Sequence, residues 1–320
     1  MREPDSTAAR AARAMLLLGA AILLGCGSAQ AAAPAAATQE KFVISGASGQ
    51  LGDLTIKELL ARGVPAANLI LVSRTPGKLA AYAKLGASTR FGDVDQPSSL
   101  PAAYAGGTRM LMISLGFAPG AGPRPPRHKL AFDAAVKAGV KRIVYTSFIG
   151  ADKGGSMLAD DHRQSEEFLR ASGAHWIALR NGVYTEMQLR NARQMARTGK
   201  VSVPPDEGKT APVLRVDCAA VAAGALLGDA SLEDRGYDIT GPELVDTRDV
   251  ARIIGEIIGR PIRVEVVSAP AGGPGPLGAL VTPPITTDAV ARIAGRPATG
   301  VRDYLLAHKA ELLAAAKTNP

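Results

Sequence analysis

The stretch Lys41-Phe-Val-Ile-Ser-Gly46-Ala-Ser-Gly49-Gln-Leu-Gly52 decides the fold of this chain. Its apolar run, residues 42–44, is typical of a buried strand, and a helical leucine pattern follows. Between them, the spacing G-x-x-G-x-x-G alone also fits an ordinary glycine-rich turn. A strand, a glycine turn and a helix in this order place free N–H groups and the positive end of a helix dipole around a pyrophosphate. We therefore predict a dinucleotide site formed by Gly46, Ser48, Gly49, Gln50, Leu51 and Gly52.

Short apolar runs alternate with helical patterns over the following residues. The strand-like runs cover residues 42–45, 69–72, 110–115, 142–146 and 176–179, and the helical patterns cover residues 51–62, 127–138 and 160–171. Such alternation is typical of parallel strands joined by crossover helices. The predicted fold class is α/β, a Rossmann-like doubly wound parallel sheet. Ligands of such sheets bind outside the carboxyl ends of the strands, where we expect the site residues.

The pattern changes near residue 214, and a smaller C-terminal α/β lobe for the substrate is predicted from about residue 214 to 320. Asp217 opens an alanine-rich helix, and Thr247 is expected to cap a helix with an isoleucine-rich face. Strands are predicted at residues 236–241 and 262–267, helices at 287–295 and 299–314, and a Gly/Pro-rich loop at 268–284. The predicted NAD(P)-binding Rossmann domain, including this lobe, covers residues 39–320.

Residues 1–38 have the order of an export leader: basic, then apolar, then small. The apolar run, residues 14–25, is too short to span a bilayer as a stop-transfer helix. Leu23-Leu-Gly-Cys26 resembles a lipobox, in which the cysteine carries a lipid, whereas Ala29-Gln-Ala31 fits a signal-peptidase cut. We expect a signal peptide or lipoprotein leader with a flexible tether, and hence an exported protein, periplasmic or membrane-tethered. A misassigned start codon would instead make the protein cytoplasmic.

Composition excludes several classes of function. The 320 residues carry a formal charge of +8, but the arginines are scattered and aromatic residues make up only 4%, so nucleic acid is not an expected partner. Cys26 lies in the leader, so Cys218 alone can form neither an internal disulfide nor a thiolate metal site. The four histidines have no ligand spacing. We predict no metal, and membrane contact only through a possible lipid on Cys26.

The end of the second predicted strand indicates which nucleotide is bound. NAD-binding domains usually place Asp or Glu there, to accept hydrogen bonds from the ribose 2′-hydroxyl. Here Ser73 is followed by Arg74 and then Lys78, and two cations suit a 2′-phosphate. We therefore favour NADP(H) as the cofactor and keep NAD(H) as the alternative. Counting a third strand between the runs at 69–72 and 110–115, which makes the later runs the fourth, fifth and sixth, Asp93 follows that strand and lies either at the adenine edge or in an ordinary turn.

Several motifs together resemble one protein family. The NmrA-like atypical short-chain dehydrogenases have motifs similar to Gly46-Ala-Ser-Gly-Gln-Leu-Gly52, Ser73-Arg74, Ala138-Gly-Val-Lys-Arg-Ile-Val-Tyr-Thr-Ser147 and Leu179-Arg-Asn-Gly-Val-Tyr184. Within that family the chain is most similar to the type 2 NAD(P)H:quinone oxidoreductases. The resemblance runs from about Lys41 to the C-terminus and leaves out the leader.

The resemblance implies roles for five further residues. Ser114, Thr146 and Ser147, at the ends of the fourth and fifth strands, would line the nicotinamide pocket. Asn181 and Tyr184 follow the sixth strand and would be the catalytic residues that face the ring and the substrate.

The chain departs from the family where protons are transferred. Ordinary short-chain dehydrogenases use a Tyr-x-x-x-Lys pair, and those positions fall here on Arg163 and Glu167. Met187 stands at a position where the quinone-reductase relatives carry an asparagine. A quinone tolerates this loss, because a hydroquinone anion is a mild base, whereas a ketone needs the missing acid. We therefore predict an oxidoreductase that transfers hydride from NADPH to a quinone-like small molecule; the alternative is a non-catalytic NAD(P)-binding sensor or scaffold of the NmrA type. The sequence does not indicate an oligomeric state.

Other polar residues keep two interpretations. His162 and Glu166, one helical turn apart, either exchange a proton or form a surface pair, which we favour. A basic group follows the fourth strand and consists of Arg124, Arg127 and His128. These side chains either contact phosphate or substrate or lie in a solvated loop.

Overall fold

The structure is a computed structural model that describes residues 40–116, 120, 122–268 and 282–318. The predicted leader, residues 1–38, lies outside the described residues, as does most of the predicted loop at 268–284. The chain from Gln39 onward forms one compact unit, which is described by itself below.

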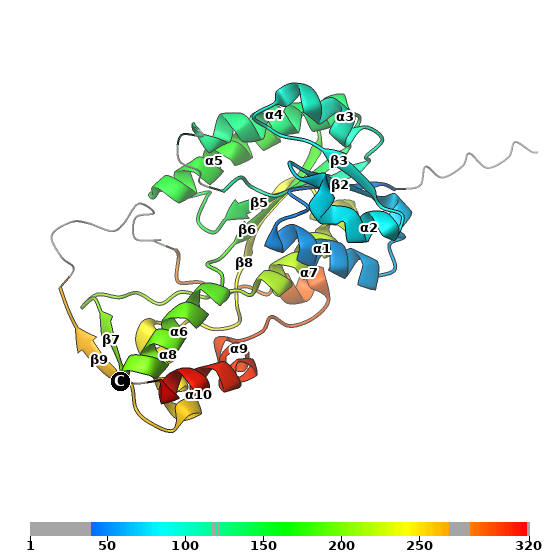
Figure 1. The fold of residues 1–320 in the computed structure, drawn as a ribbon. Coiled ribbons are helices and arrows are strands. Elements are labelled where there is room, and N and C mark those ends of the chain that lie inside the picture. Colours follow the sequence, from blue (N-terminus) through cyan, green and yellow to red (C-terminus); the bar gives the residue numbers. More distant parts are fainter. Residues whose placement is uncertain (1–39, 117–119, 121, 269–281, 319–320) are drawn as a thin grey trace, which may run out of the picture. The chain divides into compact units, whose positions relative to one another are not determined.

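Seven parallel strands form the main sheet, in the order β3-β2-β1-β4-β5-β6-β8 (Figure 1). The predicted Rossmann-like fold class is confirmed. The strand order reverses between β1 and β4, and such a reversal opens a crevice at the carboxyl ends of the strands. The strands of this sheet are β1 (Phe42–Ser45), β2 (Leu69–Ser73), β3 (Ser88–Phe91), β4 (Arg109–Met112), β5 (Arg142–Phe148), β6 (His175–Asn181) and β8 (Arg235–Ile239).

Helices cover both faces of this sheet (Figure 1). Alternate residues of the strands point to opposite faces, so Ile44 packs with α1 and α7 while Val43 packs with α3, α4 and α5. These helices are α1 (Gln50–Ala61), α3 (Leu100–Tyr104), α4 (Arg124–Lys137), α5 (Met157–Arg170) and α7 (Arg215–Leu227), and the short α2 (Ala80–Lys84) follows β2. Short 3₁₀ turns occur at η1 (Ala66–Asn68), η2 (Pro76–Leu79), η3 (Pro97–Ser99) and η4 (Ala230–Leu232).

A second, smaller apolar core is formed by helices around a two-stranded parallel sheet. Its elements are α6 (Glu186–Thr198), β7 (Lys200–Val203), α8 (Thr247–Ile258), β9 (Arg263–Val266), α9 (Val301–Ala307) and α10 (Lys309–Lys317). This lobe differs from the one predicted from residue 214, because α6 and β7 precede that residue and β8 belongs to the main sheet. Helix α7 also belongs to the main layer, since its alanines let it pack closely on α1.

Two local predictions in the C-terminal part need correction. The N-cap of α8 is Asp246 and not Thr247, because the Asp246 carboxylate accepts a hydrogen bond from the Asp249 N–H at 2.8 Å. The Asp249 carboxylate in turn accepts from the Asp246 N–H, which completes a capping box. The helix predicted at residues 287–295 is a single π-helical turn, Val290–Ala294, that ends at Gly295 with a positive φ. Both differences concern the local pattern of hydrogen bonds, which residue spacing does not specify.

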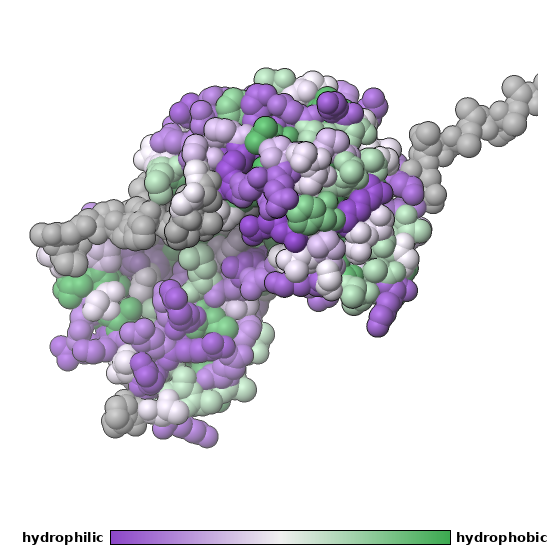
Figure 2. All heavy atoms as spheres, turned by 45° about the horizontal axis from the view of Figure 1, so that its top comes forward, coloured by the Kyte–Doolittle hydropathy of each residue, from purple (hydrophilic) through white to green (hydrophobic). Residues whose placement is uncertain are grey.

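The described residues contain no helix that is long and apolar enough to cross a membrane. Figure 2 shows hydrophilic and hydrophobic residues interspersed over one face of the molecule.

Candidate functional site

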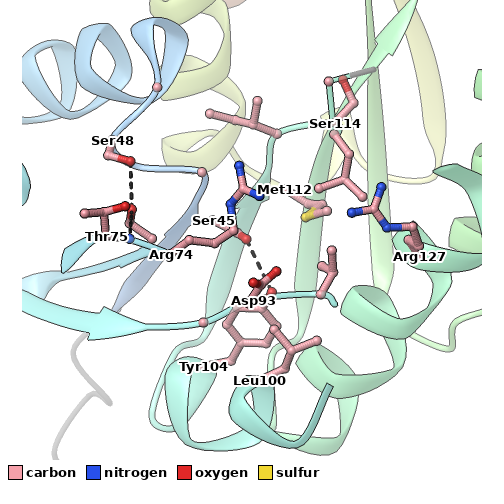
Figure 3. A pocket seen from close by; sticks show the side chains of 18 of the residues that line it. Ser45, Ser48, Arg74, Thr75, Asp93, Leu100, Tyr104, Met112, Ser114 and Arg127 are labelled. Carbon is pink, nitrogen blue, oxygen red and sulfur yellow. Dashed lines mark hydrogen bonds between the residues drawn. The ribbon is translucent and has the colours of Figure 1, made fainter. Parts of the chain in front are cut away.

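A cleft of about 430 Å³ opens at the carboxyl ends of β1, β2 and β4, at the reversal of the strand order. Seven of the predicted cofactor residues line it: Gly46, Ser48, Gly49, Arg74, Lys78, Asp93 and Ser114. Figure 3 shows side chains from the ends of β1, β2, β3 and β4 converging on this space. The sheet therefore brings together residues that are up to 68 positions apart in the sequence, as Gly46 and Ser114 are.

The glycine turn is shaped by close contacts of its backbone. Gly46 has a φ of +89°, in the left-handed region that favours glycine. A Cβ on Gly52 would lie 2.5 Å from the Gly46 carbonyl oxygen and 2.9 Å from Ala47 Cα. Gly52 and Leu51 do not line the cleft: they are buried, and Gly52 lets α1 approach the end of β1.

The first turn of α1 carries amide groups without an intrahelical acceptor. The bond from Asp53 N–H to Gly49 O, at 2.9 Å, is the first of the helix, so the N–H groups of Gln50, Leu51 and Gly52 precede it. The N-cap, Gly49, has no side chain to satisfy them. The turn therefore presents bare donors at the positive end of the helix dipole, as a pyrophosphate requires.

Two cations flank this turn. Arg74 and Lys78 line the cleft and are exposed, and neither forms an ion pair with any described residue. Hydroxyl groups adjoin them: Ser48 Oγ lies 2.7 Å from Ser73 Oγ, which accepts from the Thr75 N–H at 2.9 Å (Figure 3). Unpaired cations beside ordered hydroxyls provide the donor set that a phosphate monoester needs. The residues therefore fit the predicted 2′-phosphate.

The far side of the cleft is a mainly apolar slot. Val94, Leu100 and Met112 line it, and the Tyr104 hydroxyl lies 3.3 Å from Ser45 Oγ. Arg127, from the first turn of α4, completes the lining (Figure 3). Of the two interpretations that the sequence allowed for Arg127, the solvated loop is wrong, because Arg127 lies in a helix at the cleft.

The cleft wall that follows β4 is held by side chains of the neighbouring strand β5 and of helix α4. Thr146 Oγ1 accepts from the Ser114 N–H at 2.8 Å. At the next residue, His128 Nε2 accepts from the Leu115 N–H at 3.0 Å, and Arg124 Nη1 donates to the Leu115 carbonyl at 2.9 Å. Three side chains thus hold three consecutive peptide groups of the wall, which preorganises it before a ligand arrives.

His128 must be neutral to accept that bond. Burial, with the charges of Arg124 and Arg127 nearby, lowers the pKa of His128 to about 3. The proton on Nδ1 then points to Ser165 Oγ at 2.8 Å, and Ser165 in turn donates to the Asp161 carbonyl. Residues 124 and 128 have i, i+4 spacing, but the predicted helix began at residue 127, so the sequence did not place the two side chains on one helical face.

The pair expected at residues 162 and 166 is wrong as a surface pair. Both side chains are buried, and each has another partner. His162 Nδ1 accepts from the Tyr145 hydroxyl at 2.9 Å, and burial lowers the His162 pKa well below its usual value. Glu166 receives two hydrogen bonds from Arg180, at 2.9 and 2.8 Å. Helical spacing placed the two residues on one face but did not indicate that this face meets the sheet.

Ser147 serves the same buried network. Its hydroxyl donates to Glu166 Oε1 at 2.7 Å, and it does not line the cleft. Thr146 does not line the cleft directly either, but it holds Ser114, which does. Of these two residues at the end of β5, Thr146 therefore influences the cleft through Ser114, and Ser147 does not contact it.

Asn181 and Tyr184 lie at the carboxyl end of β6, outside the cleft. Arg215 stacks on the Tyr184 ring at 4.5 Å from its centroid, and burial raises the pKa of the Tyr184 hydroxyl. Asn181 is buried, and its Oδ1 has no hydrogen-bond partner among the described residues. Tyr184 is therefore protonated at neutral pH and is a weak proton donor.

The positions of the Tyr-x-x-x-Lys pair carry no proton relay. Arg163 and Glu167 are about half exposed and pair with each other at 2.9 Å on the outer face of α5. Cys218 is buried and burial raises its pKa, so it is a packed thiol and not a reactive one. Within the described ranges, no three His, Cys, Asp or Glu side chains are grouped to hold a metal ion.

Comparison with known proteins agrees with this geometry. A family model described as NAD(P)H-binding matches residues 46–228. Quinone oxidoreductase 2 of Escherichia coli is 36% identical over 200 residues, which cover 62% of this chain and 68% of that protein. NAD(P)H azoreductase of Xenophilus azovorans is 26% identical over 297 residues, 86% of this chain and 100% of that protein.

Solved structures give the same result. The NADPH-dependent quinone oxidoreductase of Escherichia coli, complexed with NADPH, superposes with a TM-score of 0.73 at 29% identity, over 83% of this chain and 99% of that chain. Citrobacter triphenylmethane reductase, complexed with NADP(H), also gives 0.73, at 27% identity and the same coverage. The glycine turn, the strand order and these matches together show that the chain belongs to the NAD(P)H-binding family.

Proposed function

We propose that this chain binds NADPH and reduces a quinone or a similarly conjugated, electron-poor small molecule. The observation that carries the proposal is the position of Arg74 and Lys78, which have no carboxylate partner among the described residues, beside the bare amides of α1. The amides receive the pyrophosphate, and the cations with Thr75 receive the 2′-phosphate. An NAD-binding site would place a carboxylate where Arg74 stands, so NADPH is favoured over NADH.

The acceptor follows from what the site lacks. NADPH supplies a hydride, and the protein then has to deal with the charge that reaches the acceptor. Arg163 and Glu167 form a surface ion pair, and Tyr184 is a weak acid, so the described residues offer no strong proton donor. A conjugated acceptor spreads the negative charge and takes its proton from solvent, whereas a ketone forms an alkoxide. The relatives named for quinones, azo compounds and triphenylmethane dyes all act on conjugated molecules.

The test is NADPH oxidation by the purified full chain with benzoquinone, followed by absorbance, and NADPH binding followed by calorimetry. We expect turnover in the wild type, weaker NADPH binding in Arg74→Ala, and no such change in Lys84→Ala, whose exposed lysine does not line the cleft. Absence of both binding and turnover rejects the proposal.

A non-catalytic dinucleotide sensor is the second candidate. The loss of the proton relay at Arg163 and Glu167 favours it, because a sensor has no need of one. Tight NADPH binding without oxidation by benzoquinone, azo dyes or triphenylmethane dyes is the result that supports the sensor over the reductase.

We also propose that the protein is exported. The order of charge and hydropathy in residues 1–38 supports this, with either a lipid on Cys26 or a cut after Ala31. Mass spectrometry of the N-terminus of the protein from its native host distinguishes the two products. An intact Met1 on a cytoplasmic protein contradicts export.

A further inference from the structure

Arg127 is a cation of the cleft whose orientation is fixed by the protein itself. It lies in the first turn of α4, and its side chain is only 14% exposed. The carboxylate of Asp95, in the loop after β3, accepts hydrogen bonds from Arg127 Nε at 2.8 Å and from Nη2 at 2.5 Å. This side-on pair sets the plane of the guanidinium group and leaves Nη1 without an acceptor among the described residues.

The place of Arg127 distinguishes it from the other cations. Arg74 and Lys78 lie beside the glycine turn, where a phosphate is expected, and pair with no carboxylate in the part of the chain that the structure describes. Arg127 stands across the cleft from Arg74, next to the apolar side chains of Leu100 and Met112 (Figure 3). Its charge is already balanced by Asp95, so its contribution is a planar face and one free N–H edge rather than net attraction for an anion.

A guanidinium of this kind suits a nucleobase. Its face stacks on aromatic rings, and its free edge can donate to a ring nitrogen that accepts. Asp93, on the same loop as Asp95, adds a carboxylate that accepts from an exocyclic amino group. A donor and an acceptor around an apolar slot match the mixed edge of adenine.

We propose that Arg127, held by Asp95, is a specificity residue that closes the slot over the adenine of the dinucleotide. The proposal rests on the proposed function and names a part of the same cleft. Asp95 is a positioning residue in it: the carboxylate orients the guanidinium and does not meet the ligand. The ion pair between Arg127 and Asp95 also joins α4 to the loop after β3, so it fixes the width of the slot.

The test measures binding of adenosine 2′,5′-bisphosphate, which carries the base and the 2′-phosphate but no nicotinamide, to the full chain. We expect Arg127→Ala to weaken this binding by about tenfold, the equivalent of one charge-assisted hydrogen bond. Arg127→Lys should recover little, because an ammonium group cannot keep a planar, side-on pair. Lys129→Ala is the matched control: it removes an exposed cation of the same helix that pairs with Asp133 outside the cleft.

Asp95→Asn separates orientation from charge. If Arg127 merely attracted phosphate, removing the carboxylate beside it would strengthen binding and Arg127→Lys would preserve it; that result overturns the inference. If Asp95 orients the guanidinium, Asp95→Asn weakens binding while the melting temperature stays near that of the wild type. Wild-type protein that binds neither NADPH nor the bisphosphate rejects the proposed function itself. Normal wild-type binding with an unchanged Arg127→Ala variant rejects only the role of Arg127.

Discussion

Removal of Arg74 and Lys78 should convert the proposed NADPH-selective site into one that hardly distinguishes NADPH from NADH. Charge-assisted hydrogen bonds are worth about 1.5–3 kcal/mol, and the low end applies because Arg74 and Lys78 are exposed. About 1.5 kcal/mol corresponds to roughly a tenfold change in affinity. We therefore expect Arg74→Ala to weaken NADPH binding by about tenfold, and the double variant with Lys78→Ala by somewhat less than a hundredfold, because both cations would contact one phosphate.

NADH supplies the internal control, since it lacks the 2′-phosphate. Its affinity should change by less than about twofold in both variants, as expected for surface substitutions away from a ligand. Calorimetric titration of both nucleotides at two salt concentrations checks this, and the NADPH effect should shrink at high salt because exposed charges are screened. Equal wild-type affinities for NADPH and NADH, or equal losses in Arg74→Ala, would refute the assignment of these cations to the 2′-phosphate.

Three further outcomes follow from the geometry. Gly52→Ala should abolish NADPH binding or lower the melting temperature strongly, because its Cβ would lie 2.5 Å from the Gly46 carbonyl oxygen; unchanged binding and melting contradict this packing. Burial lowers the pKa of His128 to about 3, against about 6.5 in the unfolded chain, so the unfolded state binds more protons between these values and stability should fall as the pH drops through that window. His128→Gln keeps an acceptor for the Leu115 N–H and should show a shallower pH dependence of urea unfolding; an identical slope would count against a neutral His128. Tyr184→Phe should keep most of the quinone turnover, and a hundredfold loss in kcat would make Tyr184 a required acid.

Sequence patterns predicted the main sheet and several residues that line the cleft at its carboxyl edge, because these depend on local rules. A glycine turn after a buried strand needs only neighbouring residues, and the order of strands and helices follows from alternation. Gly46, Arg74 and Ser114 are far apart in the sequence, yet each follows a strand, and parallel strands bring their carboxyl ends to one edge.

The sequence did not predict the side-chain contacts between different helices and strands, because these depend on which faces of the elements pack together. Glu166 can be buried because Arg180, on β6, pairs with its carboxylate. An arginine is too hydrophilic to be predicted at a buried position of a strand. A charged residue becomes a core residue only when its partner is known, and partners across elements leave no periodic signal. The C-terminal boundary differed for the same reason, since the spacing of Arg235–Ile239 shows a strand but not the sheet that it joins.

Helix α5 links the fold to the choice of acceptor. Its inner face holds His162 and Glu166 in hydrogen bonds to the sheet, and this face is therefore committed to packing. Its outer face places Arg163 against Glu167 as a half-exposed ion pair, so the helix that carries the proton relay in ordinary short-chain dehydrogenases carries none here. The cofactor end of the cleft, in contrast, is fixed in detail by backbone and side-chain contacts. If the proposed function holds, a site whose described residues offer no strong acid favours acceptors that stabilise their own negative charge, and we expect a conjugated acceptor to react better than a ketone.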